Sequence, residues 1–205
     1  MNIRLKVINR SDDEHRPNIV LFQKNVLADL EELTLAWKVI RNCGRDCYHP
    51  FVYPTDFEVA IGDSHGNYSP RAPVANGQAL VVRPTPSGRR LDRDPNAAHS
   101  AEIEVANALP RGSVDVNIYK AGLLVSRKTA VAPGQKAVFR FQPTLWIGVA
   151  SQVVQSAALE SAVLERINTR LSLVGIGSAD IVMTGGGPGP DARPHAFTLE
   201  NIQPY

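Results

Sequence analysis

The stretch Asn42–Pro50, NCGRDCYHP, holds both cysteines of the chain and one of its five histidines. Thiolate and imidazole ligands together suit zinc or copper. Cys43, Cys47 and His49, joined by His65 from a later loop, therefore form a candidate metal site. The spacing C-x3-C-x-H differs from the standard zinc spacings, so no cofactor is expected and a zinc or copper ion is a secondary hypothesis.

The two cysteines have other possible chemistries. In an extended strand, residues four apart lie about 13 Å from each other, whereas a disulfide needs Cα atoms within about 7 Å. Gly44 and Asp46 allow a turn that would bring the thiols together. A catalytic thiol needs a histidine base and an orienting group, and no histidine stands out as that base. We expect reduced thiols at the end of a strand containing Trp37, followed by a turn at His49; bridged and metal-bound cysteines remain open alternatives.

A second candidate site is the stretch GDSHGNY at residues 62–68, between the apolar run FEVAI and the stretch YSPRAPV. Its small and polar residues predict a hairpin loop, with glycine taking a positive φ. Asp63, His65 and Asn67 offer polar groups to a ligand, and Tyr68 offers an aromatic face. A calcium loop is not indicated, because histidine interrupts the oxygen ligands and no suitable glutamate follows.

Two further segments resemble phosphate-binding or nucleic-acid-binding motifs but lack residues that those motifs need. The run MTGGGPGP at 183–190 lacks the Lys-Ser/Thr and the helix of a phosphate-binding loop, so it predicts a plain loop. Residues 83–99 are rich in Arg, Pro and Asp, but acids alternate with the arginines and no aromatic residue is present for base stacking. With a formal net charge of +2, the chain gives no indication of a nucleic-acid partner.

The residues that must position these sites lie in short apolar runs. Proline and glycine number 15 each and separate the runs, a pattern typical of many short strands. Two stretches have helical spacing instead, Val26–Leu33 and Ser151–Ile167. The predicted strands are Ile3–Ile8, Asn18–Gln23, Leu33–Arg41, Asp56–Ile61, Ala79–Arg83, Ala101–Ala106, Val114–Tyr119, Leu123–Lys128, Lys136–Phe141, Leu145–Ala150, Leu171–Ile176 and Asp180–Met183.

These elements predict an all-β protein, an antiparallel β-sandwich of immunoglobulin-like or jelly-roll-like type with one or two short helices. The immunoglobulin order Cys…Trp…Cys is absent, because Trp37 precedes both cysteines. We expect one domain over residues 1–205. The alternative is two related half-sandwiches, 1–83 and 100–205, joined by a linker loop at 84–99. It rests on one internal echo: V-A-x-G-Q precedes an apolar strand at Val74 and again at Val131.

The N-terminal residues lack the apolar core of a secretory signal, and no apolar run is long enough to span a bilayer. A cytoplasmic protein is expected, with leaderless export left open.

Apolar strands at a sheet edge pair readily with another chain. The sequence therefore favours a non-enzymatic protein that self-assembles or binds a protein partner through strand edges, most simply as a homo-oligomer. A lectin-like or small-ligand-binding module is the alternative, and a Cys/His metal protein is the third hypothesis.

Overall fold

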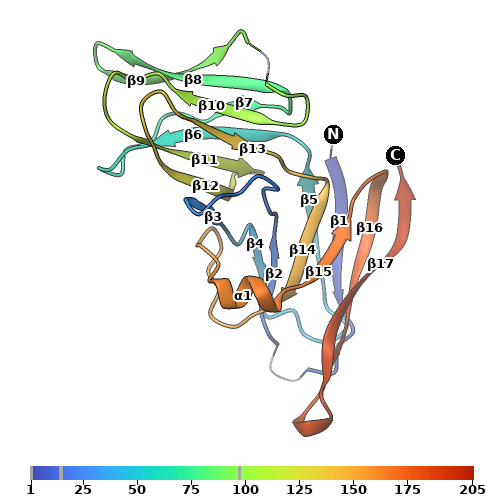
Figure 1. Cartoon of the computed structure of the whole chain (residues 1–205). Coiled ribbons are helices and arrows are strands. Elements are labelled where there is room, and N and C mark those ends of the chain that lie inside the picture. Colours follow the sequence, from blue (N-terminus) through green and yellow to red (C-terminus); the bar gives the residue numbers. More distant parts are fainter. Residues whose placement is uncertain (1, 14–15, 97) are drawn as a thin grey trace. The chain divides into compact units, whose positions relative to one another are not determined.

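The computed structural model describes residues 2–13, 16–96 and 98–205. The chain is mostly β, with four mainly antiparallel sheets, none of them closed into a barrel (Figure 1). The all-β class predicted from the short apolar runs is confirmed. Among the described residues, no helix is both long enough and apolar enough to cross a membrane.

The chain divides into two compact units, each with two sheets. Unit 1 consists of Met1–Gln23, Leu35–Thr55 and Pro143–Tyr205. Unit 2 consists of Lys24–Thr34 and Asp56–Gln142. The chain thus leaves unit 1 twice and returns to it twice, so neither unit is a continuous stretch of sequence.

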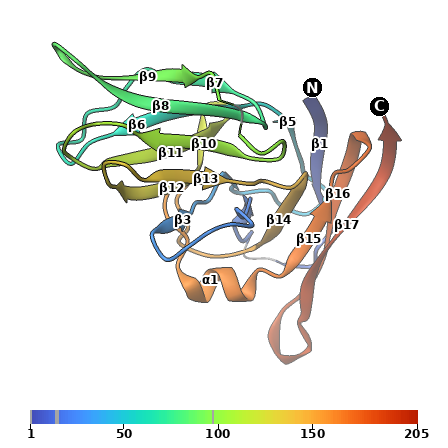
Figure 2. The ribbon, with the colours of Figure 1, turned by 45° about the horizontal axis from the view of Figure 1, so that its top comes forward.

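Unit 1 contains one sheet of order β17-β16-β1-β5 and one of order β15-β14-β2-β4. β1 and β16 are parallel, and the other pairs are antiparallel. β16 and β17 form a long hairpin (Figure 2). The elements of unit 1 are β1 (Asn2–Asn9), β2 (Ile19–Phe22), β4 (Lys38–Ile40), β5 (Tyr48–Pro54), β14 (Thr144–Val149), α1 (Ser161–Arg166), β15 (Thr169–Ser172), β16 (Ile176–Gly186), the 3-10 turn Gly189–Asp191 and β17 (Arg193–Pro204).

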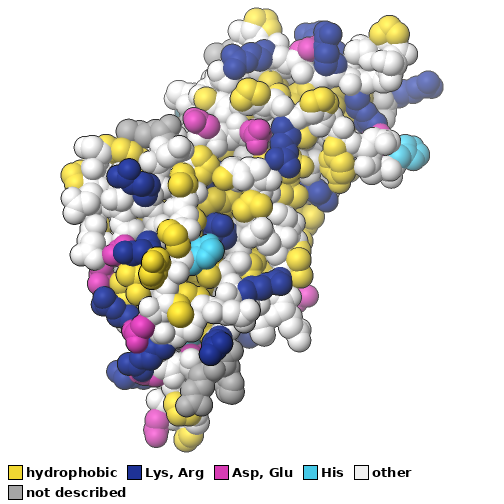
Figure 3. Space-filling view, turned by 180° about the vertical axis from the view of Figure 1, so that it is seen from behind, with side chains coloured by type: hydrophobic (Ala, Val, Ile, Leu, Met, Phe, Trp, Pro, Cys, Tyr) yellow, Lys and Arg dark blue, Asp and Glu magenta, His cyan; other side chains and the backbone are white. Residues whose placement is uncertain are grey.

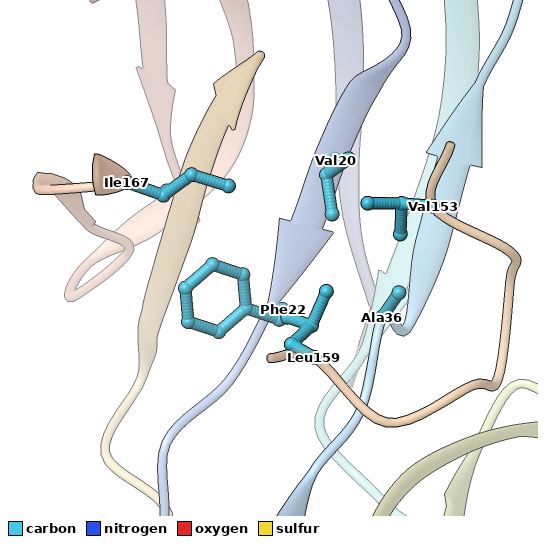
Figure 4. Packing of buried hydrophobic residues seen from close by; sticks show 6 residues of the cluster. All are labelled: Val20, Phe22, Ala36, Val153, Leu159 and Ile167. Atoms are coloured by element: carbon cyan, nitrogen blue, oxygen red, sulfur yellow. The ribbon is translucent and has the colours of Figure 1, made fainter. Parts of the chain in front are cut away.

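One part of the unit 1 core gathers around β2, whose four residues are all buried. Phe22 stacks on Trp146 of the neighbouring strand, with ring centroids 6.2 Å apart. A Cβ atom at Gly148 would come within 2.7 Å of Ile167, so glycine is what lets that side chain pack there. Figure 4 shows the cluster, which consists of Val20, Phe22, Ala36, Val153, Leu159 and Ile167.

Unit 2 contains one sheet of order β13-β10-β8-β9 and one of order β3-β12-β11-β6-β7. β8 and β10 are parallel, and all other pairs are antiparallel. The strands are β3 (Glu32–Thr34), β6 (Phe57–Gly62), β7 (Ala72–Val74), β8 (Gln78–Thr85), β9 (Gly88–Asp94), β10 (Ile103–Asn107), β11 (Val114–Lys120), β12 (Leu123–Val131) and β13 (Lys136–Phe139).

The V-A-x-G-Q echo encodes the same turn twice, at residues 74–78 and 131–135. In each turn the glutamine N–H donates to the alanine carbonyl three residues earlier, at 3.2 and 3.0 Å. The glutamine side-chain oxygen accepts from that alanine's N–H, at 3.0 and 3.3 Å. The glycines have φ of 83° and 78°. Both turns belong to unit 2, where they lead into β8 and β13 on the two sides of β10.

The helix predicted at Val26–Leu33 is wrong. The Asn25 side-chain oxygen accepts hydrogen bonds from the N–H groups of Leu27 (3.1 Å) and Arg140 (2.7 Å). Such side-chain contacts compete with helical hydrogen bonds, and Glu32–Thr34 pairs with β12 instead. The helix predicted at 151–167 is confirmed only over Ser161–Arg166.

Two predicted loops are strands. Residues 84–99 were expected to be a loop but contain β9, a sheet-edge strand that pairs with β8. Its many arginines and aspartates are more typical of a loop, so the sequence does not indicate a strand there. Charged side chains are a common feature of edge strands because they discourage pairing with other chains. His49 and Pro50, expected to begin a turn, lie in β5 and pair with Val7 and Lys6 of β1.

Candidate ligand-binding site

The predicted loop at residues 62–68 joins β6 to β7, so the hairpin is confirmed. The Asp63 N–H donates to the Asn67 carbonyl (3.0 Å), and the Gly66 N–H donates to the Asp63 carbonyl (3.1 Å). Gly66 has a φ of 80°, which glycine adopts without steric cost. The loop is therefore shaped by its own residues.

The Asp63 carboxylate is the centre of this loop. It accepts hydrogen bonds from the backbone N–H groups of His65 and Asn67, both at 2.9 Å, and from the Asn67 side-chain amide at 3.1 Å. It also forms an ion pair with the Arg89 guanidinium at 2.5 Å. The Asn67 donors, aided by Arg89, lower the pKa of Asp63 to about 2. Asp63 therefore acts within the protein, fixing the loop and orienting Arg89.

Three connections of unit 2 meet at a hollow of about 610 Å³. They are the β6–β7 loop, the β8–β9 turn and the β10–β11 loop. A smaller hollow of about 340 Å³ lies beside it and shares Asp63, Gly88 and Arg89 with it. The Asp63–Arg89 ion pair thus contributes to the walls of both hollows.

The β10–β11 loop is held by a buried asparagine at the end of β10. The Asn107 side-chain oxygen accepts from the Leu109 N–H at 3.0 Å. Its side-chain NH₂ donates to the carbonyls of Gly112 (3.0 Å) and Val131 (2.9 Å). These bonds position Arg111, which lines the larger hollow.

The larger hollow has a cationic lining. Arg89 and Arg111 line it, with His65 beside them, and Asp63 is the one acid among its lining residues in the described chain. Hydroxyl groups of Ser64 and Ser113 add neutral hydrogen-bonding groups. On the face shown in Figure 3, Lys and Arg side chains lie scattered among acidic and uncharged ones.

The smaller hollow is lined by Tyr68, which is 55% exposed. A Cβ atom at Gly62 would lie 3.1 Å from the Tyr68 ring, so glycine there allows the ring to lie against β6. An exposed ring fixed in this way offers an apolar surface beside polar groups.

The four predicted residues of this loop thus line the two hollows, with His65 in the larger, Asn67 and Tyr68 in the smaller, and Asp63 in both. Sequence reasoning missed Arg89 and Arg111. Arg89 was hidden because its strand was read as a loop. No local pattern marks Arg111, which follows a Leu-Pro pair in the β10–β11 connection.

The cysteine stretch lies in unit 1, and both thiols are free. The Cys43 thiol is buried and donates to the Cys47 carbonyl at 3.6 Å, whereas Cys47 is exposed. His49 lies in β5, where burial and the nearby charge of Lys38 lower its pKa. His65 belongs to unit 2. Within the described parts of the chain, no group of three or more His, Cys, Asp or Glu residues is placed to hold a metal ion.

Comparison of the chain with models of protein families, with curated proteins and with solved structures finds no match. The functional argument therefore rests on the geometry of the hollows.

Proposed function

We propose that this protein is a non-enzymatic binding protein, and that unit 2 binds a small carboxylate-bearing ligand, such as an acidic sugar, in its two adjoining hollows. The observation that carries the proposal is the position of Arg89, which an ion pair with Asp63 holds at the boundary of both hollows. A guanidinium has five N–H donors in a planar fork, so one ion pair leaves donors for a second carboxylate.

The scaffold that supports this function is proposed to be a β-sandwich formed by the two sheets of unit 2. Burial alternates along β10, whereas in β11 three successive residues, Val116–Ile118, are buried. Phe141 stacks on both Phe139 and Phe57, with centroids 6.1 and 5.1 Å apart, and those two residues belong to different sheets. Loops at one end of a rigid sandwich are a frequent place for binding residues.

Ligand recognition in this proposal divides between the two hollows. The ligand carboxylate binds Arg89 and Arg111, where charge-assisted hydrogen bonds are strongest. The ligand's apolar face lies against Tyr68, and its hydroxyl groups reach the serines and Asn67. This arrangement accounts for a site that is polar, open and cationic.

Isothermal titration calorimetry with glucuronate and galacturonate, against glucose and galactose, tests the proposal. We expect only the two uronates to bind, and Arg111→Gln to weaken that binding by about tenfold, as the loss of one charged contact does. The matched control is Arg4→Gln, an exposed arginine of unit 1, which leaves affinity unchanged. Equal responses to uronates and neutral sugars contradict the proposal, as does an unaltered affinity in Arg111→Gln.

Protein binding through a strand edge is the second candidate. Val26, Leu27, Leu30 and Leu33 are all exposed, with Leu30 entirely so. Leu33 lies in β3, the edge strand of its sheet. An exposed apolar segment at a sheet edge is a typical site for pairing with a second copy or another chain. Light scattering at increasing concentration should show a homo-oligomer that Leu30→Asp dissociates, and a strict monomer would count against this candidate.

A further inference from the structure

The loop between β4 and β5 brings the two cysteines of unit 1 close together. The Cys47 N–H donates to the Gly44 carbonyl at 3.0 Å, which closes a tight turn. Asn42 and Asp46 have φ of 54° and 62°, a left-handed conformation that Asn and Asp tolerate better than most residues. The chain therefore reverses direction between the two cysteines. Such a turn is needed for the thiols to come close, because an extended chain would hold them about 13 Å apart.

Asn9, a buried residue at the end of β1, holds both cysteines. Its side-chain NH₂ donates to the Cys43 carbonyl at 2.7 Å, and its backbone N–H donates to the Cys47 carbonyl at 3.0 Å. The Cys43 sulfur lies 3.6 Å from that Cys47 carbonyl oxygen. Because a carbonyl oxygen is about 2.4 Å from its own Cα, this sulfur is within about 6 Å of the Cys47 Cα atom. Closure of a disulfide would require the two side chains to rotate toward each other across this short separation.

The two thiols differ in access. Cys43 is buried, whereas Cys47 is exposed and lines a hollow of about 640 Å³. Burial and the neighbouring Cys47 raise the pKa of the Cys43 thiol, so Cys43 remains protonated longer. A small disulfide therefore reaches the exposed Cys47 thiol first, and the buried Cys43 thiol is left to react second.

The hollow beside Cys47 carries two guanidinium groups. Arg16 and Arg45 both line it, as do the acids Asp12 and Asp13, and Arg45 forms an ion pair with Asp12. The Arg16 Nε and Cys47 Sγ atoms lie 3.6 and 4.0 Å from the point a Cβ at Gly44 would occupy, so both border the same space. A disulfide compound with carboxylate groups fits these cations while its sulfurs approach Cys47.

We propose that Cys43 and Cys47 are a thiol–disulfide exchange site for small disulfides that carry carboxylates. The Cys47 thiolate attacks one sulfur of the compound, the S–S bond breaks, and a thiolate leaves and takes up the proton that Cys47 lost. Cys43 then loses its proton and attacks the Cys47 sulfur, which releases the second small thiol. The protein gains one disulfide and loses two hydrogens, and the small disulfide is reduced to two thiols.

Intact-mass analysis of the reduced full chain, incubated natively with oxidised glutathione, tests this site. Wild type should lose about 2 Da without retaining an adduct, as closure of one disulfide requires. Cys43→Ser should stop at a glutathione adduct on Cys47, and Cys47→Ser should not react. The proposal is overturned if wild type keeps a stable adduct, does not react, or closes the bond only when denatured.

Folding defects in the variants are separated by circular dichroism and thermal unfolding of each protein. If a serine variant does not fold, the mass change of native wild type decides alone. Carboxylate recognition has its own test: Arg45→Gln should slow reaction with oxidised glutathione about threefold relative to uncharged hydroxyethyl disulfide. If the ratio of the two rates is the same in Arg45→Gln as in wild type, Arg45 does not recognise the carboxylates of the disulfide, and that part of the proposal is wrong. All these outcomes are independent of ligand binding by unit 2.

Discussion

Each of the two units has a strand that ends in a buried asparagine, and the two asparagines make similar hydrogen bonds. β1 in unit 1 and β10 in unit 2 each lie between one parallel and one antiparallel partner. Each ends in a buried asparagine, Asn9 or Asn107, whose side-chain oxygen accepts from the N–H two residues later. Each asparagine also donates to the carbonyl of a loop that lines a hollow.

The hollows differ in how their ion pairs are held. The Asp63–Arg89 side chains of unit 2 are 10% and 28% exposed, whereas Asp12 and Arg45 of unit 1 are 44% and 61% exposed. Exposed pairs contribute little because water screens them. The comparison indicates that Arg89 in unit 2 is held in a less exposed ion pair than Arg45 in unit 1.

The largest effect is expected from Asn107→Ala, which leaves the carbonyls of Gly112 and Val131 without that donor. We expect a loss of about 3 kcal/mol in the free energy of unfolding, because buried polar groups left unpaired are costly. Urea denaturation measures the loss, and calorimetry with a uronate measures the loss of binding. A change below about 1 kcal/mol would contradict the role given to Asn107.

The corresponding variant in unit 1, Asn9→Ala, should cost about 2 kcal/mol, because it breaks two side-chain hydrogen bonds rather than three. It should also slow disulfide closure, since the Cys43 carbonyl is no longer held. Asn168→Ala, an exposed position in the same unit, is the control and should leave both measurements unchanged. Faster disulfide closure in Asn9→Ala would mean that the hydrogen bond from Asn9 to the Cys43 carbonyl opposes disulfide formation.

The units should also differ in their response to pH, because unit 2 buries Lys120. Burial lowers the pKa of Lys120 to about 7, and its ammonium lies 4.2 Å from the centre of the Phe57 ring. Between pH 7 and 10.5 the unfolded chain binds more protons at this residue than the folded chain, so stability rises with pH. Lys120→Met should stabilise the protein by about 1–2 kcal/mol at pH 6 and by less at pH 10. An equal gain at both pH values would show that charge burial is not the cause.

Asp63 should give a pH dependence in the same direction as Lys120, with stability rising with pH, but in the acidic range. Its pKa is lowered to about 2 by the Asn67 donors, so its carboxylate stabilises the loop above the ordinary aspartate value, and this stabilisation is lost as pH falls through about 2. NMR titration of the carboxyl carbon measures the midpoint. Asn67→Ala removes the side-chain donor and should move the midpoint upward, and an unmoved midpoint would assign the shift to the backbone N–H groups of Asn67 and His65 and to Arg89.

The smallest effect is expected from the Asp12–Arg45 pair. A double-mutant cycle with Asp12→Asn and Arg45→Gln should give a coupling energy of about 0.5 kcal/mol or less. The same cycle at Asp63 and Arg89 should give a clearly larger coupling. Equal couplings would show that the lower exposure of the Asp63–Arg89 pair does not strengthen it.

Much of the local structure was predictable from the sequence. The loop at 62–68 and the two Ala-x-Gly-Gln turns were identified from turn residues, because a positive φ is a property of the residue itself. The helix predicted at 26–33 failed for a non-local reason. Asn25 bonds to Arg140, and β3 pairs with β12, contacts that no window of sequence contains.

The candidate site was predictable only in part. Asp63, His65, Asn67 and Tyr68 form one stretch whose polar character is visible. The structure gives two of them a different role from the ligand contact predicted. Asp63 and Asn67 hydrogen-bond to each other, and Asp63 forms an ion pair with Arg89. The strands LKVIN and IEVAN both end in asparagine, a shared sequence feature whose role only the hydrogen bonds of Asn9 and Asn107 make clear.

The sequence by itself determined an all-β chain and its tight turns, and it allowed a loop reversal between Cys43 and Cys47. These follow from side-chain periodicity and from the φ preferences of glycine, asparagine and aspartate. Only the tertiary structure decided which strands are neighbours, and so which loops share a hollow. Strand pairing joins residues far apart in the chain, and alternating burial marks a strand without naming its partner.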